Sequence, residues 1–325
     1  MYRSHSGTDS RGMRTFTRKG EVLSTTFTAN TPIETNLNIT ELVRSLPFIG
    51  IHLACLAVVW TGVSTTALAV GFLTLAVRMF GLTAGYHRYF CHKAFRTTRV
   101  FQFVLAWLGT SAAQKGPLWW AGHHRSHHRY SDTEEDVHPP GVKGFFWAHA
   151  GWIMSRKNQP TKVEWVPDLV KFPELVWLDQ NHYIAPISLG LALFFLGEWA
   201  EEIYPALGTN GWQMVVVALF CSTTVLYHAT FAVNSIGHLF GSRRYVTNDE
   251  SRNSLLLALV TGGEGWHNNH HRYPTSERQG FYWWEIDFTH YGVVLLSWLR
   301  IVWDIRGPVP SVLGDATQQS STMVS

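Results

Sequence analysis

Long apolar stretches alternate with polar, charged segments along this chain of 325 residues. No charged residue occurs from position 45 to position 77, and mostly apolar stretches follow at 180–198 and 211–233. A helix that crosses a bilayer needs about 20 residues, so the first stretch accommodates two such helices with a turn near Gly62. The pattern predicts an all-α, integral membrane protein with four transmembrane helices at about 46–63, 65–84, 180–198 and 211–233.

The remaining segments are polar and are predicted to lie outside the bilayer. Residues 1–45 are rich in Ser and Thr and lack the apolar core of a secretion signal, so a polar N-terminal tail is expected, with another at 311–325. Segments 85–178 and 236–310 are separated by two membrane helices, and an even number of crossings returns the chain to the same side. They are predicted to form one helical cap, in a membrane domain that spans 46–310.

The positive charges indicate which side of the membrane this cap occupies. Of the 26 Lys and Arg residues, six lie in 1–44, twelve in 88–171 and seven from 243 onward, while the two opposite loops contain none. Positive charge is typical of cytoplasmic loops, so both termini and the cap are predicted to be cytosolic, in a bacterial inner membrane or the endoplasmic reticulum. The net charge of +3 is too small to favour nucleic acid as a partner.

Histidines are concentrated in the segments assigned to this cap. The three clusters read HRYFCH at 87–92, HHRSHH at 123–128 and HNNHH at 267–271, and His238 follows the last predicted membrane helix. In an HxxHH box the residues at i, i+3 and i+4 project from one helix face, so each can present three imidazoles to one space. His87 and His92 are about 140° apart on a regular helix, so they either serve different metals or sit where a helix ends.

Isolated histidines are more often packed or solvated side chains than ligands. This interpretation is applied to His5, His52, His149, His182, His228 and His290. His123 and His138 are intermediate, with structural or supporting roles favoured over ligation. The three cysteines, Cys55, Cys91 and Cys221, are interpreted as packed, reduced thiols.

The number of clustered histidines indicates how many metal ions the site holds and which metals suit it. Neutral imidazole suits Zn, Cu, Fe and Ni, and a catalytic zinc needs only three protein ligands. Eight or nine imidazoles exceed the needs of one ion and suggest two. Two redox-active irons can activate O2 and remove hydrogen from an unactivated methylene, which zinc cannot do. The nearby acidic residues Asp132, Glu134, Glu135 and Asp136 are candidates to accept histidine N–H groups, although a solvated acidic loop is about as plausible.

The three histidine boxes and the sequences that flank them resemble those of the membrane fatty acyl desaturases, above all the acyl-CoA (stearoyl-CoA, Δ9) branch. The resemblance runs from about residue 45 to residue 307 and includes GYHRYFCHKAF, NSIGHLFG, GEGWHNNHHRYP and WWEIDFT. It implies an oxidoreductase with a di-iron centre that uses O2 as co-substrate. The ligands that it implies are His87, His92, His124, His127, His128, His238, His267, His270 and His271, with Asn234 binding through a water.

The same resemblance implies substrate contacts. Gln114, Trp120 and Thr230 should line the tunnel for the acyl chain, and Arg156 and Lys157 should meet the phosphates of CoA. The animal enzymes have an Arg-Asp pair where this chain has Gly122 and His123, so a contact to the CoA head group is missing. An acyl-lipid substrate therefore remains an alternative to acyl-CoA, and an acyl-carrier-protein substrate is a weaker one. At Phe231 the animal enzymes have Trp.

The chain contains neither a haem-binding domain nor a CxxC pair, so electrons are expected from a separate donor. A basic cytosolic face favours an acidic donor such as cytochrome b5 or ferredoxin with its reductase. The nearest alternative activity is that of a membrane fatty-acyl or alkane hydroxylase. A membrane metal transporter is disfavoured, since a transport path needs polar groups through the bilayer and the predicted spans carry few.

Overall fold

The computed structural model describes residues 17–18, 21–22 and 39–314, in two compact units divided after Ile39. In the first unit, the short strands β1 (Thr17–Arg18) and β2 (Glu21–Val22) pair antiparallel. The predicted polar tails at 1–45 and 311–325 fall mostly outside the described residues. All further elements belong to the second unit, which is mostly helical.

Three helices of the second unit are long and apolar enough to cross a membrane: Thr65–Cys91, Ile184–Ile203 and Pro205–Leu239. The first combines α3 (Thr65–Phe80) with the π-helix η2 (Gly81–Cys91), and the second is α9 (Ile184–Ile203). The third contains η6 (Pro205–Leu207), α10 (Gly211–Met214), the π-helix η7 (Val215–Cys221) and α11 (Ser222–Leu239). Membrane association is therefore confirmed at the level of three apolar helices.

The first predicted span is less regular. It consists of α1 (Ile39–Ala54), the 3-10 turn η1 (Cys55–Ala57) and α2 (Val58–Thr61), and its apolar part covers only Ser45–Thr61. The chain leaves the helix at Gly62, whose φ of 68° is readily adopted only by glycine. A fourth span remains a prediction, because 17 residues fall short of the usual length.

The second predicted span continues beyond its expected end at residue 84. Two of the glycines in η2 face α4 (Arg99–Ser111), which packs against η2. A Cβ on Gly81 would lie 2.6 Å from the backbone N of Gly109, and one on Gly85 would lie 3.0 Å from the Leu105 carbonyl oxygen. The glycines thus permit close helix packing here and do not end the helix.

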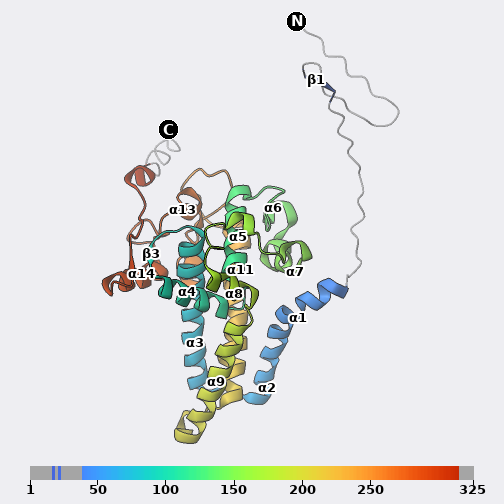
Figure 1. Ribbon diagram of the computed structural model, residues 1–325, viewed down its shortest axis with the longest axis vertical. Coiled ribbons are helices and arrows are strands. Elements are labelled where there is room, and N and C mark those ends of the chain that lie inside the picture. Colours follow the sequence, from blue (N-terminus) through green and yellow to red (C-terminus); the bar gives the residue numbers. More distant parts are fainter. Residues whose placement is uncertain (1–16, 19–20, 23–38, 315–325) are drawn as a thin grey trace. The chain divides into compact units, whose positions relative to one another are not determined.

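The cap segments are built from short helices joined by turns. Between α4 and α9 lie α5 (Pro117–Tyr130), α6 (Pro140–Lys143), η3 (Trp147–Gly151), α7 (Trp152–Met154), η4 (Arg156–Asn158), η5 (Val163–Trp165) and α8 (Pro173–Gln180). After α11 come α12 (Leu255–Val260), α13 (His267–Arg272) and α14 (Phe288–Trp298). Strand β3 (Arg96–Thr97) pairs antiparallel with β4 (Val302–Trp303) and so joins the two cap segments. Figure 1 shows α5 and α13 at the same end of α3 and α11.

Candidate metal centre

Four elements bring the clustered histidines together: η2, α5, α11 and α13. Among the described residues, three groups have one ligand atom from each residue within 4.8 Å of all the others, and two of these consist of histidines alone; the third is His127, Asp136 and His138. The first group contains His87, His92, His124, His128 and His270, and the second contains His127, His238, His267 and His271. These are the nine histidines predicted as ligands, and each group could hold a metal ion.

The π-helix explains the unusual spacing of the first box. His87 lies in η2, and His92 is the residue that ends it. The backbone N–H of His92 donates to the His87 carbonyl oxygen at 3.3 Å, which is the i→i+5 bond of a π-helix. The two imidazoles therefore lie in the same group, and their ring centroids are 4.9 Å apart. Of the two possibilities left open by the sequence, His92 at a helix end is the one observed.

The other two boxes are each divided between the groups. On α5, His124 and His128 join the first group and His127 joins the second. On α13, His270 joins the first group, whereas His267 and His271 join the second. The prediction that a box presents three imidazoles to one space is thus wrong for both. On each helix the residues at i and i+4 share one group and the residue at i+3 joins the other, because the helix lies between the two groups and presents neighbouring positions to different sides.

The nitrogens of the first group are spaced like corners of one coordination shell. Four Nε2–Nε2 distances link the five residues in series: 2.9 Å for His92–His124, 3.0 Å for His124–His128, 2.9 Å for His128–His270 and 3.0 Å for His270–His87. Two metal–nitrogen bonds of about 2.1 Å at a right angle place their nitrogens about 3.0 Å apart, whereas a tetrahedral angle places them about 3.4 Å apart. The spacing is therefore compatible with nitrogens that share one metal ion.

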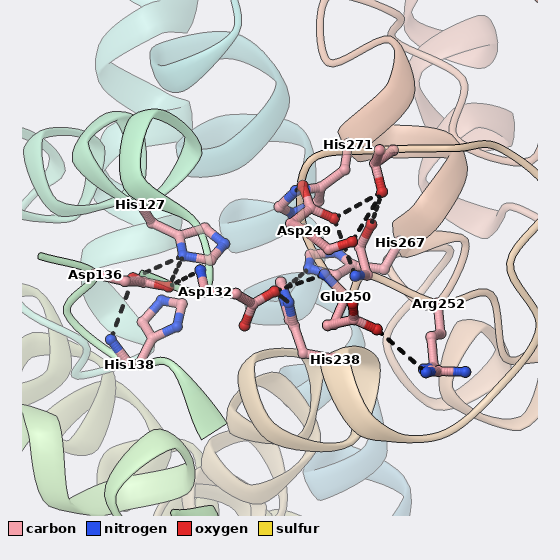
Figure 2. A network of polar contacts seen from close by, with 12 residues as sticks. His127, Asp132, Asp136, His138, His238, Asp249, Glu250, Arg252, His267 and His271 are labelled. Carbon is pink, nitrogen blue, oxygen red and sulfur yellow. Dashed lines mark hydrogen bonds and ion pairs between the residues drawn. The ribbon is translucent and has the colours of Figure 1, made fainter. Parts of the chain in front are cut away.

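In the second group, three histidines each have a carboxylate beside Nδ1, which accepts a hydrogen bond from that nitrogen (Figure 2). The Nδ1 atoms of His127, His238 and His271 lie 2.9, 2.8 and 2.7 Å from Asp136, Asp132 and Asp249. A carboxylate accepts the Nδ1 proton, so Nε2 is left as a bare lone pair, which is the tautomer that binds metal. Asp132 and Asp136 were candidates from the sequence, whereas Glu134 and Glu135 are exposed. Asp249 was missed, because it lies 22 residues before its histidine.

Two of these lone pairs lack a hydrogen-bond partner among the described residues. His127 Nε2 and His271 Nε2 are buried and make no hydrogen bond. A buried polar atom without a partner is costly, and a cation shared by the group would satisfy both. The donor set and its orphaned nitrogens therefore fit a bound metal ion.

Burial also favours the neutral form of two imidazoles of the first group. Desolvation, followed by the repulsion of neighbouring histidines, holds the pKa of His124 and His128 well below the usual range. Neutral imidazole is the form that coordinates metals. Both side chains are therefore ready to bind an ion at neutral pH without first losing a proton.

Behind His87 lies a buried ion-pair network that sequence reasoning did not find. The Glu264 carboxylate meets His87 Nδ1, and Arg88 lies 3.1 Å from Glu264, 3.3 Å from Glu277 and 2.9 Å from Asp287. All of these side chains are less than a tenth exposed. The network fixes η2 against the segment around α13. The segment GEGWHNNHH places an acidic residue, Glu264, three positions before a predicted ligand and could have indicated this contact, but it was used only as part of the resemblance.

A cavity of about 260 Å³ lies beside the first histidine group. Gln114, Trp120, Thr230 and Asn234 line it together with His124. Gln114 Nε2 donates to Thr230 Oγ1 at 2.8 Å, and Trp120 stacks on His124 with ring centroids 5.0 Å apart. The residues predicted to line an acyl tunnel are thus brought together.

The two residues predicted to bind the CoA head group lie next to the cavity but not in its wall. Arg156 and Lys157 are exposed in the short turn η4 and do not line the cavity, although Met154 and Gln159 on either side of that turn do. His123, at one of the positions where the sequence departs from the animal enzymes, is buried between Trp119 and Trp152.

Comparison with known proteins places the chain in a family. The family model for fatty acid desaturases matches residues 64–294. An sn-1 stearoyl-lipid 9-desaturase of Anabaena variabilis is 36% identical over 267 residues, which cover 81% of this chain and 93% of that protein. The sn-1 stearoyl-lipid 9-desaturase of a Synechocystis strain is 36% identical over 273 residues, covering 82% and 81%. An acyl-CoA 5-desaturase of Anemone leveillei is 32% identical over 275 residues, covering 83% and 81%. The chain therefore belongs to the fatty acid desaturase family.

Proposed function

We propose that this protein is an O2-dependent desaturase that introduces a cis double bond, at the Δ9 position, into a saturated fatty acyl chain. The observation that carries the proposal is the apolar cavity that runs up to His124 in the first of two histidine groups. A long acyl chain needs a narrow, mostly apolar site that fixes one methylene pair beside the oxidant. The relatives from Anabaena and Synechocystis, named as 9-desaturases, support the position of the double bond.

We infer that each histidine group holds one iron ion. When bound, the two irons supply the oxidising power that removes hydrogen from an unactivated methylene. Asp132, Asp136 and Asp249 hold three imidazoles of the second group in the metal-binding tautomer and orientation. Asn234, which lines the cavity, is assigned a water beside the metals.

The cavity walls orient the acyl chain. Trp120 stacks against His124 and so presents a flat apolar surface next to the first group. The Gln114–Thr230 hydrogen bond joins the loop before α5 to α11 across the cavity. A chain that bends around this bond has its reacting methylenes held at one place, which reduces the entropy lost in reaching the transition state.

The proposed reaction needs no general acid or base in contact with the carbon chain, and its atoms and electrons balance as follows. Two hydrogens leave adjacent methylenes, and one O2, two electrons and two protons are consumed with them to give two water molecules. The electrons come from a separate donor, for which an acidic cytochrome b5 or a ferredoxin with its reductase fits the basic face. The arrangement in the bilayer is proposed to be four spans, with the cap and both termini cytosolic.

Coenzyme A is proposed as the carrier of the acyl chain, because the exposed Arg156 and Lys157 beside the cavity suit phosphate groups. A membrane lipid is the second candidate. It is favoured by His123, whose buried ring between two tryptophans offers no charge to a CoA head group, and by two relatives named as acting on stearoyl-lipid.

Replacing Arg156 and Lys157 together with glutamine distinguishes the carriers. If CoA is bound here, the KM for stearoyl-CoA should rise about tenfold or more, because charge-assisted hydrogen bonds are lost, while kcat changes little. Lys171 is also exposed and belongs to the same cap segment, 85–178, so Lys171→Gln is the matched control. An unchanged KM, together with conversion of stearoyl groups in lipid vesicles, would assign the lipid carrier instead.

Expression in a desaturase-deficient host tests the reaction itself. Gas chromatography of total fatty acids should show a new Δ9 cis-monoene, absent from cells that carry an empty vector. A hydroxylated chain without alkene would instead identify the protein as a hydroxylase. Positional analysis of the same product settles the regiochemistry.

A further inference from the structure

Three histidines outside the metal groups form a hydrogen-bonded chain of their own. His52 of α1 lies 3.1 Å from His228 of α11, Nε2 to Nε2. The other ring nitrogen of His228, Nδ1, lies 3.0 Å from His149 Nε2 in η3. His149 Nδ1 then lies 2.9 Å from the Ser235 hydroxyl. Taken singly, each histidine was interpreted as packed or solvated, but the fold connects all three.

The chain has one hydrogen bond more than its neutral groups can supply. At one end His52 Nδ1 lies 2.7 Å from the Phe48 carbonyl oxygen, and at the other the Ser235 hydroxyl donates to the Phe231 carbonyl oxygen at 3.1 Å. Both ends are carbonyls, which only accept. Three neutral imidazoles and one hydroxyl offer four protons in total, whereas the bonds from Phe48 to Phe231 number five. While all four groups are neutral, one of the five contacts therefore has no proton between its two atoms, and a proton that enters the chain has a place to go.

This arrangement suits the transfer of protons and does not suit the binding of a metal. His228 uses its two ring nitrogens toward different neighbours. A metal site needs one nitrogen from each ring to converge on a point, as in the two groups described above. An imidazole that accepts a proton on one nitrogen and releases one from the other is instead an ordinary proton shuttle.

The chain of histidines leads from the surface toward the metal centre. His228 is exposed at the end of the apolar helix where α11 contacts η3 of the cap, and His52 and His149 are half-buried, whereas Ser235 is fully buried. Ser235 follows Asn234, which lines the acyl cavity together with His124. It also precedes His238 of the second group by three residues, or about 4.5 Å along the helix axis. The inner end therefore lies on the same part of α11 as Asn234, which lines the cavity, and His238 of the second histidine group.

We propose that the His52–His228–His149 chain relays protons to the site of O2 reduction. The inference rests on the proposed desaturase function, in which each turnover consumes two protons. These protons are needed at a buried site from which the acyl chain excludes water. The histidines pass each proton to Ser235 through His149, and a proton taken up at His228, the exposed member, restores the chain.

A purely structural role for the same residues makes a different prediction. His52 and His228 connect α1 to α11, so their loss could act by loosening that contact. A second polar contact joins the same two parts of the fold, since Cys55 Sγ lies 3.3 Å from Thr224 Oγ1. Thr224→Val removes this contact, nearly without change of shape and without touching the histidines, and is the matched control.

His228→Phe in the full-length membrane protein, assayed with its electron donor, tests the relay. We expect kcat for the alkene to fall about 10- to 100-fold, within or below the range for proton-transfer groups. The solvent deuterium isotope effect should increase. More O2 should be consumed per alkene formed, because reduced oxygen whose protonation is slow leaves the site and takes up two protons from solvent to give hydrogen peroxide. Thr224→Val should change none of these three quantities. A loss of kcat with an unchanged isotope effect and unchanged O2-to-alkene ratio would overturn the proposal.

Chemical rescue provides a second readout. Imidazole added to His228→Ala should restore part of kcat and return the isotope effect toward the wild-type value, with no such gain for the wild-type protein. Absence of rescue together with an unaltered isotope effect would count against the relay. Failure of the desaturase assignment is recognised separately, because then the wild-type protein itself forms no alkene.

Discussion

Replacing His127 with alanine is expected to abolish alkene formation, to below about 1% of wild type, while the protein still inserts into the membrane. His127 contributes one of the four nitrogens of the second group, and its Nε2 has no other partner. Loss of even an outer partner of a metal ligand typically lowers affinity or activity about 10- to 100-fold, so loss of the ligand itself should have a larger effect. His271→Ala should behave in the same way.

Two measurements separate loss of metal from loss of fold. The iron content of the purified protein, by mass spectrometry, should fall from about two ions to about one per chain in either variant, if each group holds one ion. Elution from a size-exclusion column in detergent should remain that of the wild type. Full activity with undiminished iron in either variant would show that these histidines are not ligands.

A graded variant supports the same assignment. Asp249→Asn retains the size of the side chain but weakens acceptance of the His271 Nδ1 proton, a contact of 2.7 Å. Activity should therefore fall less than in His271→Ala. The sequence alone did not suggest this variant, since nothing in the spacing of Asp249 distinguishes it from a surface residue.

The difference between what could and could not be predicted follows from the range of the interactions. Periodicity and the apolar stretches indicated an all-α membrane protein, and the dense boxes indicated eight of the nine histidines that gather, because both signals are local in sequence. The ninth, His238, was predicted only through the resemblance to the desaturases. The division of each box between two groups was not predictable, since it depends on how α5 and α13 pass between the other elements. The same is true of the π-helix that places His87 and His92 together.

Long-range polar contacts account for most of the remaining surprises. His52 and His228 are 176 residues apart and His149 and His228 are 79 apart, so each looked like an isolated histidine. The first predicted span also differs, because η1 interrupts its helix and the apolar part covers only Ser45–Thr61. The apolar composition of this segment does not indicate where its helix is interrupted by a 3-10 turn.

Replacing Arg88 with methionine is expected to destabilise the protein by about 3–5 kcal/mol, the usual cost of removing one partner from a buried ion pair. The Arg88 side chain is 1% exposed and lies within 3.3 Å of Glu264, Glu277 and Asp287. Without the guanidinium, three buried carboxylates would face one another with no cation among them. One or more would have to take up a proton, or the segment would open to water.

Thermal unfolding in detergent, followed by the loss of the monodisperse size-exclusion peak, measures this effect. The control is Arg99→Gln, which removes an exposed arginine whose Nε lies 2.7 Å from Glu174. Exposed pairs of this kind contribute little to stability, so the control should unfold close to the wild-type temperature. Because Glu264 also meets His87 Nδ1, Arg88→Met protein that remains folded should bind less iron. Equal stability of Arg88→Met and Arg99→Gln would contradict the role assigned to the network.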